Sequence, residues 1–359
     1  MLHWSPADLD ALLFKLRDEG FRVIGPSVRD GAIVYADLDA LPVGVGDDQE
    51  AGRYRLRERG DQARFGYNLG PSSFKQYLFP SREELFAYAD GNIVPAPLDD
   101  EKLAFIGVRA CELAAIQVLD RVFAGDGFKD RRYQARRRNL LMIAVDCSQS
   151  APTCFCASSG DGPGVGEGAD LVLTELLDDG EPSYAVRAGS DRGAELLAAS
   201  EAKTAPPDLE ERVRAVVEET REGLARSLPR EGLRDALLGA LNHPHWQEVA
   251  DRCLACGNCT QVCPTCFCST AVEETDPVTL RVSHVRQWDS CFTAGHSYVH
   301  GGPVHAGIAS RYRQWLTHKL ASWEDQFGRS GCTGCGRCIS WCPVGIDLTA
   351  EAEVLRSPA

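Results

Sequence analysis

Two runs of cysteine in the last third of the chain share one spacing. Each run reads C-x-x-C-x-x-C-x-x-x-C-P, the spacing with which bacterial ferredoxins bind two 4Fe-4S clusters. In that arrangement three closely spaced thiolates bind one cluster, and the fourth cysteine binds the other cluster. The repeat therefore predicts a pair of clusters with exchanged ligands. The runs comprise Cys253, Cys256, Cys259 and Cys263 before Pro264, and Cys332, Cys335, Cys338 and Cys342 before Pro343.

The exchange of ligands assigns each of the eight thiols to one cluster. Glycines between the ligands, such as Gly257 and Gly334, let the backbone curl around a cluster and direct amide groups at its sulfur atoms. Clusters held in this way lie close together, so we expect a module that stores and passes electrons but transforms no substrate. The predicted ligands are Cys253, Cys256, Cys259 and Cys342 for cluster A, and Cys332, Cys335, Cys338 and Cys263 for cluster B.

Zinc is the alternative occupant for paired cysteines. A zinc ribbon uses two C-x-x-C pairs, and it has no need of a third cysteine at the next step or of a fourth followed by proline. A zinc-stabilised scaffold without a redox role would be colourless and would hold about one zinc per four thiolates. The doubled spacing favours iron–sulfur clusters.

Four further cysteines are predicted to meet at one edge of a sheet. Cys111 and Cys147 each follow an apolar stretch that reads as a parallel strand, and sites form at the carboxyl ends of such strands. Cys111 also begins a helix, whose N-terminus favours a thiolate. Zinc on the same ligands is an alternative, and so is simple burial of the first two thiols as small hydrophobic groups. We favour a third 4Fe-4S cluster on Cys111, Cys147, Cys154 and Cys156.

Three cysteines remain without an assignment, namely Cys266, Cys268 and Cys291. The segment 264–268 repeats the residues Pro-Thr-Cys-Phe-Cys of 152–156. These thiols could bind a further metal with a non-cysteine ligand, exchange places with one of the four above, or pack around the clusters; packing is favoured. Five of the eight histidines lie between His284 and His318, in what we expect to be a polar loop around the ferredoxin core.

The elements that must position these thiols divide the chain into three regions. Residues 1–203 are predicted to form an α/β domain, in which strand 103–108, helix 111–122 and strand 140–145 make a parallel βαβ unit. Ser5-Pro6 predicts a first helix, and a capping box at 81–84 predicts another. The other expected strands are 21–24, 32–35, 53–57, 171–174 and 183–186.

Residues 204–250 are predicted to form a helical connector without chemistry, with helices at 208–225 and 230–241. Residues 251–359 are predicted to form a bacterial-type dicluster ferredoxin domain, with a long insertion between the two cysteine runs. The expected fold is therefore an α/β N-terminal domain joined by a helical connector to a two-cluster ferredoxin domain.

Composition excludes several classes of protein. The 359 residues include 15 cysteines, an odd number in a chain without a predicted export signal, which argues against a disulfide framework. A net charge of −14 argues against nucleic-acid binding, and no apolar run is long enough to span a membrane. No glycine-rich dinucleotide or nucleotide loop follows a strand. We therefore expect no catalytic site in this chain, which would receive its electrons from another protein of a complex.

The chain resembles the iron–sulfur beta subunit of cytoplasmic sulfhydrogenase-type NiFe hydrogenases, a family that includes the iron–sulfur subunit of anaerobic sulfite reductase. One departure is Ala110-Cys111-Glu112, where the family has Pro-Cys-Asp. The resemblance rests on segments 107–112, 153–156, 253–259, 263–268, 288–291 and 332–338.

This resemblance implies an electron-transfer subunit in the cytoplasm. One implied partner is a flavin-containing NAD(P)H subunit. The other partner would be a catalytic hydrogenase pair or a sirohaem sulfite reductase subunit.

Overall fold

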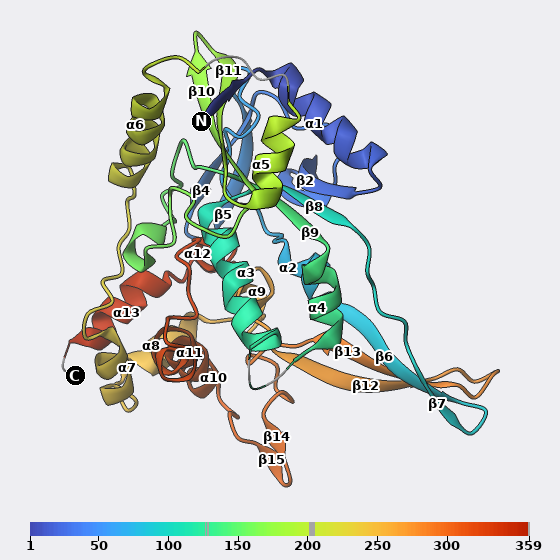
Figure 1. The fold of residues 1–359 in the computed structure, drawn as a ribbon. Helices are drawn as coiled ribbons and strands as arrows, with labels where there is room; N and C mark the ends of the chain where they lie inside the picture. Colours follow the sequence, from blue (N-terminus) through green and yellow to red (C-terminus); the bar gives the residue numbers. More distant parts are fainter. Residues whose placement is uncertain (126, 128, 201–204, 358–359) are drawn as a thin grey trace.

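The computed structural model describes residues 1–125, 127, 129–200 and 205–357, and it has an α/β region at its N-terminal end (Figure 1). Within these residues the largest sheet has seven strands in the order β1-β11-β10-β9-β8-β2-β3. The four central strands are parallel, and the strands at the edges pair antiparallel. The expected α/β fold is confirmed. The strands are β1 (Leu2–Trp4), β2 (Arg22–Arg29), β3 (Ala32–Asp37), β8 (Leu103–Val108), β9 (Leu140–Val145), β10 (Leu171–Asp178) and β11 (Glu181–Ala188).

The predicted βαβ unit is the centre of this sheet. Strands β8 and β9 pair in parallel and are buried along their whole length, as expected of a sheet covered on both faces. Helix α3 (Ala110–Phe123) connects them. Phe105 of β8 packs on the α3 side, whereas Ile106 packs with leucines of helix α1 (Pro6–Asp18), which begins at the predicted Ser5 cap. Helices α4 (Arg131–Arg138) and α5 (Asp191–Ala198) complete this region.

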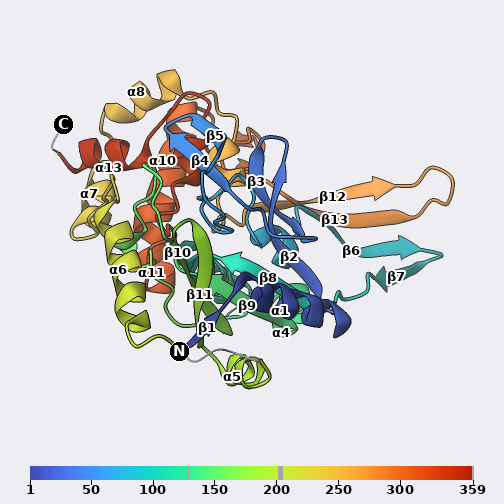
Figure 2. The same ribbon diagram turned by 90° about the horizontal axis from the view of Figure 1, so that it is seen from above.

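A second sheet has the order β12-β13-β6-β7 and projects from the body as an arm (Figure 2). Its strands come from distant parts of the chain: β6 (Arg82–Ala89), β7 (Asn92–Pro95), β12 (Ser269–Thr275) and β13 (Val282–Trp288). The helix predicted from the capping box at 81–84 is therefore wrong. Strand β6 pairs along both edges, and its buried Glu83 accepts hydrogen bonds from Arg136 and Arg286. Long-range pairing outweighs the local helix signal.

The connector contains the two expected helices in shortened form, α6 (Leu209–Glu222) and α7 (Leu233–Gly239). The predicted boundary at residues 203 and 204 lies outside the described residues. The cysteine-rich region forms its own core around Trp246, Trp315 and Leu316. Its elements are α8 (His245–Arg252), α9 (Asn258–Gln261), β14 (Tyr298–Val299), β15 (Gly302–Pro303), α10 (Ile308–Thr317), η2 (His318–Ser322), α11 (Trp323–Phe327), α12 (Arg337–Ser340) and α13 (Leu348–Arg356).

Three short elements join the two cores. The hairpin of β4 (Val45–Glu50) and β5 (Arg53–Glu58) contacts α12, where the Gly52 amide donates to the Ile339 carbonyl at 3.0 Å. Helix α2 (Lys75–Leu78) and the turn η1 (Cys156–Ser159) lie at the same junction. No helix in the described ranges is long and apolar enough to cross a membrane.

Candidate metal centres

The four thiols predicted to bind cluster A line a single cavity. The backbone amide of Ala255 donates to Cys253 Sγ at 3.4 Å, and that of Ile346 donates to Cys342 Sγ at 3.3 Å. Gly257 has a φ of 74°, which allows the turn into α9 that the sequence predicted. The walls are otherwise apolar. The lining includes Cys253, Cys256, Cys259, Cys342, Phe292, Tyr312 and Trp315.

The four thiols predicted for cluster B also converge. Burial raises the pKa of Cys338 well above its usual value, and the nearby thiolates of Cys332, Cys335 and Cys263 raise it further. The amide of Gly334 donates to Cys332 Sγ at 3.4 Å. Cys338 also faces Cys259, a predicted ligand of cluster A. The two predicted ligand sets are therefore neighbours.

The four cysteines of the N-terminal region meet around a third cavity, as their positions after parallel strands predicted. Cys111 lies in the first turn of α3 after β8, and Cys147 follows β9. Burial raises the pKa of Cys154 to about 12, and it raises the pKa of Cys111 strongly. Burial therefore outweighs the helix N-terminus that was expected to favour a thiolate at Cys111. The lining includes Cys111, Cys147, Cys154, Cys156 and also Cys335.

A close backbone approach joins this third cavity to the second cysteine run. The amide of Phe155 donates to the Gly334 carbonyl at 2.9 Å. Gly334 has a φ of 65°, and a Cβ atom there would lie 2.6 Å from the backbone of Cys156. Only glycine fits this position without a shift, which explains why Cys335 can line the third cavity.

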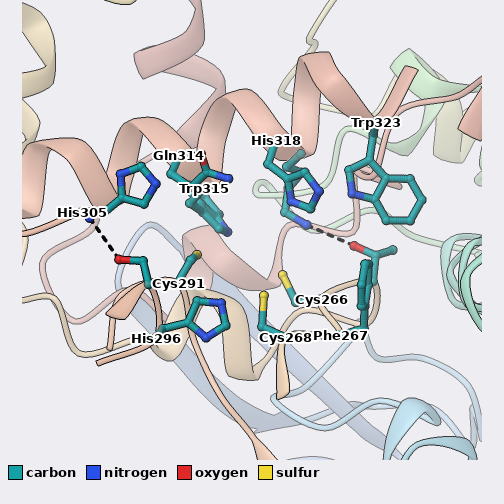
Figure 3. Close-up of a pocket in the computed structure, with 13 residues that line it drawn as sticks. Cys266, Phe267, Cys268, Cys291, His296, His305, Gln314, Trp315, His318 and Trp323 are labelled. Carbon is teal, nitrogen blue, oxygen red and sulfur yellow. Dashed lines mark hydrogen bonds between the residues drawn. The ribbon is translucent and has the colours of Figure 1, made fainter. Parts of the chain in front are cut away.

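The three cysteines left without an assignment line a further cavity of about 350 Å³ (Figure 3). Figure 3 places Cys266, Cys268 and Cys291 along its lower side, with His318 on the helix above. The polar loop expected around the ferredoxin core contributes His296 and His305 to the same cavity. These thiols surround open space instead of filling a packed core.

The donor sets suit a group larger than one ion. In the described part of the chain, no three His, Cys, Asp or Glu side chains are grouped as a single metal ion requires. The first and third cavities are each lined by four thiols in otherwise largely apolar walls. Thiolates are the protein ligands of 4Fe-4S clusters, so the residues fit that group.

Comparison with known proteins agrees with this chemistry. A family model described as a 4Fe-4S dicluster domain matches residues 252–346. The chain is 30% identical over 286 residues to subunit beta of sulfhydrogenase 2 from Pyrococcus furiosus, which covers 79% of this chain and 82% of that protein. The chain belongs to the sulfhydrogenase beta-subunit family. The dicluster match confirms two 4Fe-4S clusters as its cofactors, and no solved structure matches it.

Two buried charges of this family member were not found from its sequence. Arg337 and Glu112 form an ion pair in which the side chains are 0% and 1% exposed. The Arg337 guanidinium also donates to the Gly70 carbonyl at 2.8 Å, and Glu112 accepts from the Phe74 amide at 3.1 Å. Each residue adjoins a predicted ligand, which is the only sequence signal that pointed to them.

Two buried lysines accompany the dicluster region of this family member. Lys319 Nζ lies 3.2 Å from Cys263 Sγ. Burial alone lowers the pKa of Lys319, but the thiolates of Cys263 and Cys266 outweigh burial and raise that pKa well above its usual value. Lys75 Nζ donates to the carbonyls of the same two cysteines at 2.9 and 3.0 Å. Positive charge is therefore held beside the anionic thiolates of cluster B.

Proposed function

We propose that this chain is the electron-transfer subunit of a sulfhydrogenase-type complex. It would carry electrons between catalytic hydrogenase subunits and a flavin-containing NAD(P)H subunit. A bound 4Fe-4S cluster supplies one-electron transfer. The curated relative is named as a subunit of a sulfhydrogenase, which supports hydrogenase partners over a sulfite reductase partner. The same resemblance favours a cytoplasmic location.

We further propose a third 4Fe-4S cluster on Cys111, Cys147, Cys154 and Cys156. The observation that carries this proposal is the position of Cys335, a predicted ligand of cluster B whose side chain also lines the third cavity. On the other side of cluster B, Cys338 faces Cys259 of cluster A. The three ligand sets thus form an unbroken series, with cluster B in the middle.

The residues around these thiols have three roles in this function. Apolar walls exclude water from the ligands, amides such as that of Gly334 donate to sulfur, and Lys319 offsets negative charge. Hydrogen bonds, net charge and exposure are the means by which a protein sets cluster potentials. We propose that residues 1–203 and 251–359 act as two domains that hold one series of clusters, with residues 204–250 between them.

Iron and acid-labile sulfide analysis of the anaerobic protein tests the third cluster. Replacing Cys154 and Cys156 by serine should remove about 4 iron atoms per chain and one electron paramagnetic resonance (EPR) signal. The exposed Ser148→Ala, beside Cys147, is the matched control and should retain all iron. Unchanged iron in the double variant would remove the third cluster from the proposal.

Partner identity is tested on the native complex. Purified anaerobically, the complex should contain a flavin subunit, and both NAD(P)H and hydrogen should reduce the clusters of this chain. A complex that contains sirohaem and is not reduced by hydrogen would indicate the sulfite reductase assignment. A colourless protein with zinc in place of iron would contradict an electron-transfer role.

A further inference from the structure

The cavity lined by Cys266, Cys268 and Cys291 has no role in the series of three clusters. It is distinct from the two cavities described for cluster A and for the third cluster, because none of the predicted ligands of those clusters lines it. Its thiols come from two segments, the turn after Pro264 and the segment that follows β13. Burial raises the pKa of Cys291 to about 12. Three buried thiols that face open space are the donors of a soft metal centre.

A histidine oriented for ligation completes this set. His296 lines the cavity, and its Nδ1 lies 2.9 Å from Asp289 Oδ2. The amide of Asp289 donates to the Cys268 carbonyl at 2.9 Å, which fixes the carboxylate relative to the thiols. A carboxylate bonded to one ring nitrogen orients the other nitrogen, here Nε2, toward a metal. Figure 3 shows the His296 ring beside Cys268 and Cys291.

The cavity lies beside the ligands of both ferredoxin clusters. Cys266 and Cys263 are within hydrogen-bonding reach of each other, so the cavity adjoins cluster B. The charge of Cys291 acts directly on Cys259, so the cavity also adjoins cluster A. Lys319 forms part of the wall, where a buried cation would offset the negative charge of three thiolates.

We propose that Cys266, Cys268, Cys291 and His296 bind a fourth 4Fe-4S cluster. A single zinc ion would need its four donors about 2.0–2.3 Å away, and the described residues include no group drawn together in that way. A cavity of about 350 Å³ instead suits a polynuclear group. The proposal adds a carrier beside clusters A and B, and it depends on neither the third cluster nor the identity of the partners.

The test uses the full chain, prepared anaerobically. Replacing Cys268 and Cys291 by serine should remove about 4 iron atoms per chain while the EPR signals of clusters A and B persist. His296→Cys should keep the iron but abolish the nitrogen hyperfine coupling that pulsed EPR detects on the reduced protein. His300→Ala, which alters an exposed histidine of the same loop, should change neither readout.

Two results would overturn the proposal. One is full iron content in the double serine variant, and the other is a wild-type reduced protein in which pulsed EPR finds no histidine coupling. The second measurement needs no variant, so misfolding of the serine variant leaves the proposal falsifiable. Iron lost in the Cys268 and Cys291 variant but not in the Cys154 and Cys156 variant would support the fourth cluster and remove the third. The reverse result would do the opposite.

Discussion

Arg337 and Glu112 form a fully buried ion pair that joins the α/β region to the ferredoxin module. Glu112 follows Cys111, and Arg337 precedes Cys338, so the pair lies between ligands of two different predicted clusters. Burial disfavours a charged guanidinium, but the carboxylate of Glu112 outweighs that effect and raises the pKa of Arg337. Because each charge has the other as its charged partner, neither is tolerated alone.

Removing one partner of this pair should destabilise the protein strongly. Arg337→Met leaves Glu112 as an uncompensated buried charge, for which we expect a loss of about 3–5 kcal/mol. The double variant Arg337→Met with Glu112→Leu should recover part of that loss. Anaerobic thermal or denaturant unfolding measures both changes in the free energy of unfolding.

The exposed pair of Lys15 and Glu19, 3.9 Å apart, is the control. Lys15→Ala should change the free energy of unfolding by about 0–1 kcal/mol. An Arg337→Met variant as stable as this control would show that the buried pair does not hold the two regions together.

The difference between local and distant information explains what the sequence could predict. The cysteine spacings and the apolar runs of β8 and β9 are local patterns, so the candidate ligands and the βαβ unit could be found from them. The pair of Glu112 and Arg337 joins residues 225 positions apart, and Lys319 lies 56 positions from Cys263. Such contacts depend on how the two regions pack, and no local spacing encodes them.

The error at residues 81–84 has the same cause. Ser81 and Glu84 match a capping box, yet the Arg281 guanidinium binds Glu84 across the pairing of β6 with β13. A partner almost 200 residues away decides between helix and strand at this site. The roles of the histidines were hidden for a similar reason, because the fold brings His296 to Cys268.

Replacing Lys319 should lower the reduction potential of cluster B. The ammonium group lies 3.2 Å from Cys263 Sγ, and a nearby positive charge favours the more negative, reduced state of the cluster. Lys319→Met should therefore shift the midpoint of one EPR-monitored redox titration to a more negative value. Lys319→Arg keeps the charge and should shift it less. The exposed Lys102→Met is the control, and a shift of equal size there would contradict a local effect.

Gly334→Ala should separate the third site from cluster B. A Cβ atom there would lie 2.6 Å from the Cys156 backbone, and the φ of 65° adds about 1 kcal/mol of strain for a residue other than glycine. We expect loss of about 4 iron atoms per chain together with reduced stability. Gly328→Ala is a matched control, because its φ is 68° and a Cβ atom would meet nothing within 4 Å. Iron retained equally in both variants would show that the close approach at Gly334 is not needed.

Removal of iron should loosen the molecule unevenly. Four of the eight ferredoxin cysteines, Cys253, Cys259, Cys338 and Cys342, pack directly against the core of the cysteine-rich region. In the cluster-free protein these thiols lose the group that holds them together, and metal binding of this kind contributes to folding free energy. Strands β8 and β9 lie in a separate core and keep their hydrogen-bonded ladder.

Hydrogen exchange before and after oxidative removal of iron with a chelator measures this difference. We expect protection to fall across α8 to α13 and to persist in β8 and β9, with intermediate loss at residues 147–163 beside the third cavity. Equal loss in both regions would mean that the two cores unfold as one unit, which would contradict the proposed division at residues 204–250. Unchanged protection throughout would mean that the thiols are held by packing alone.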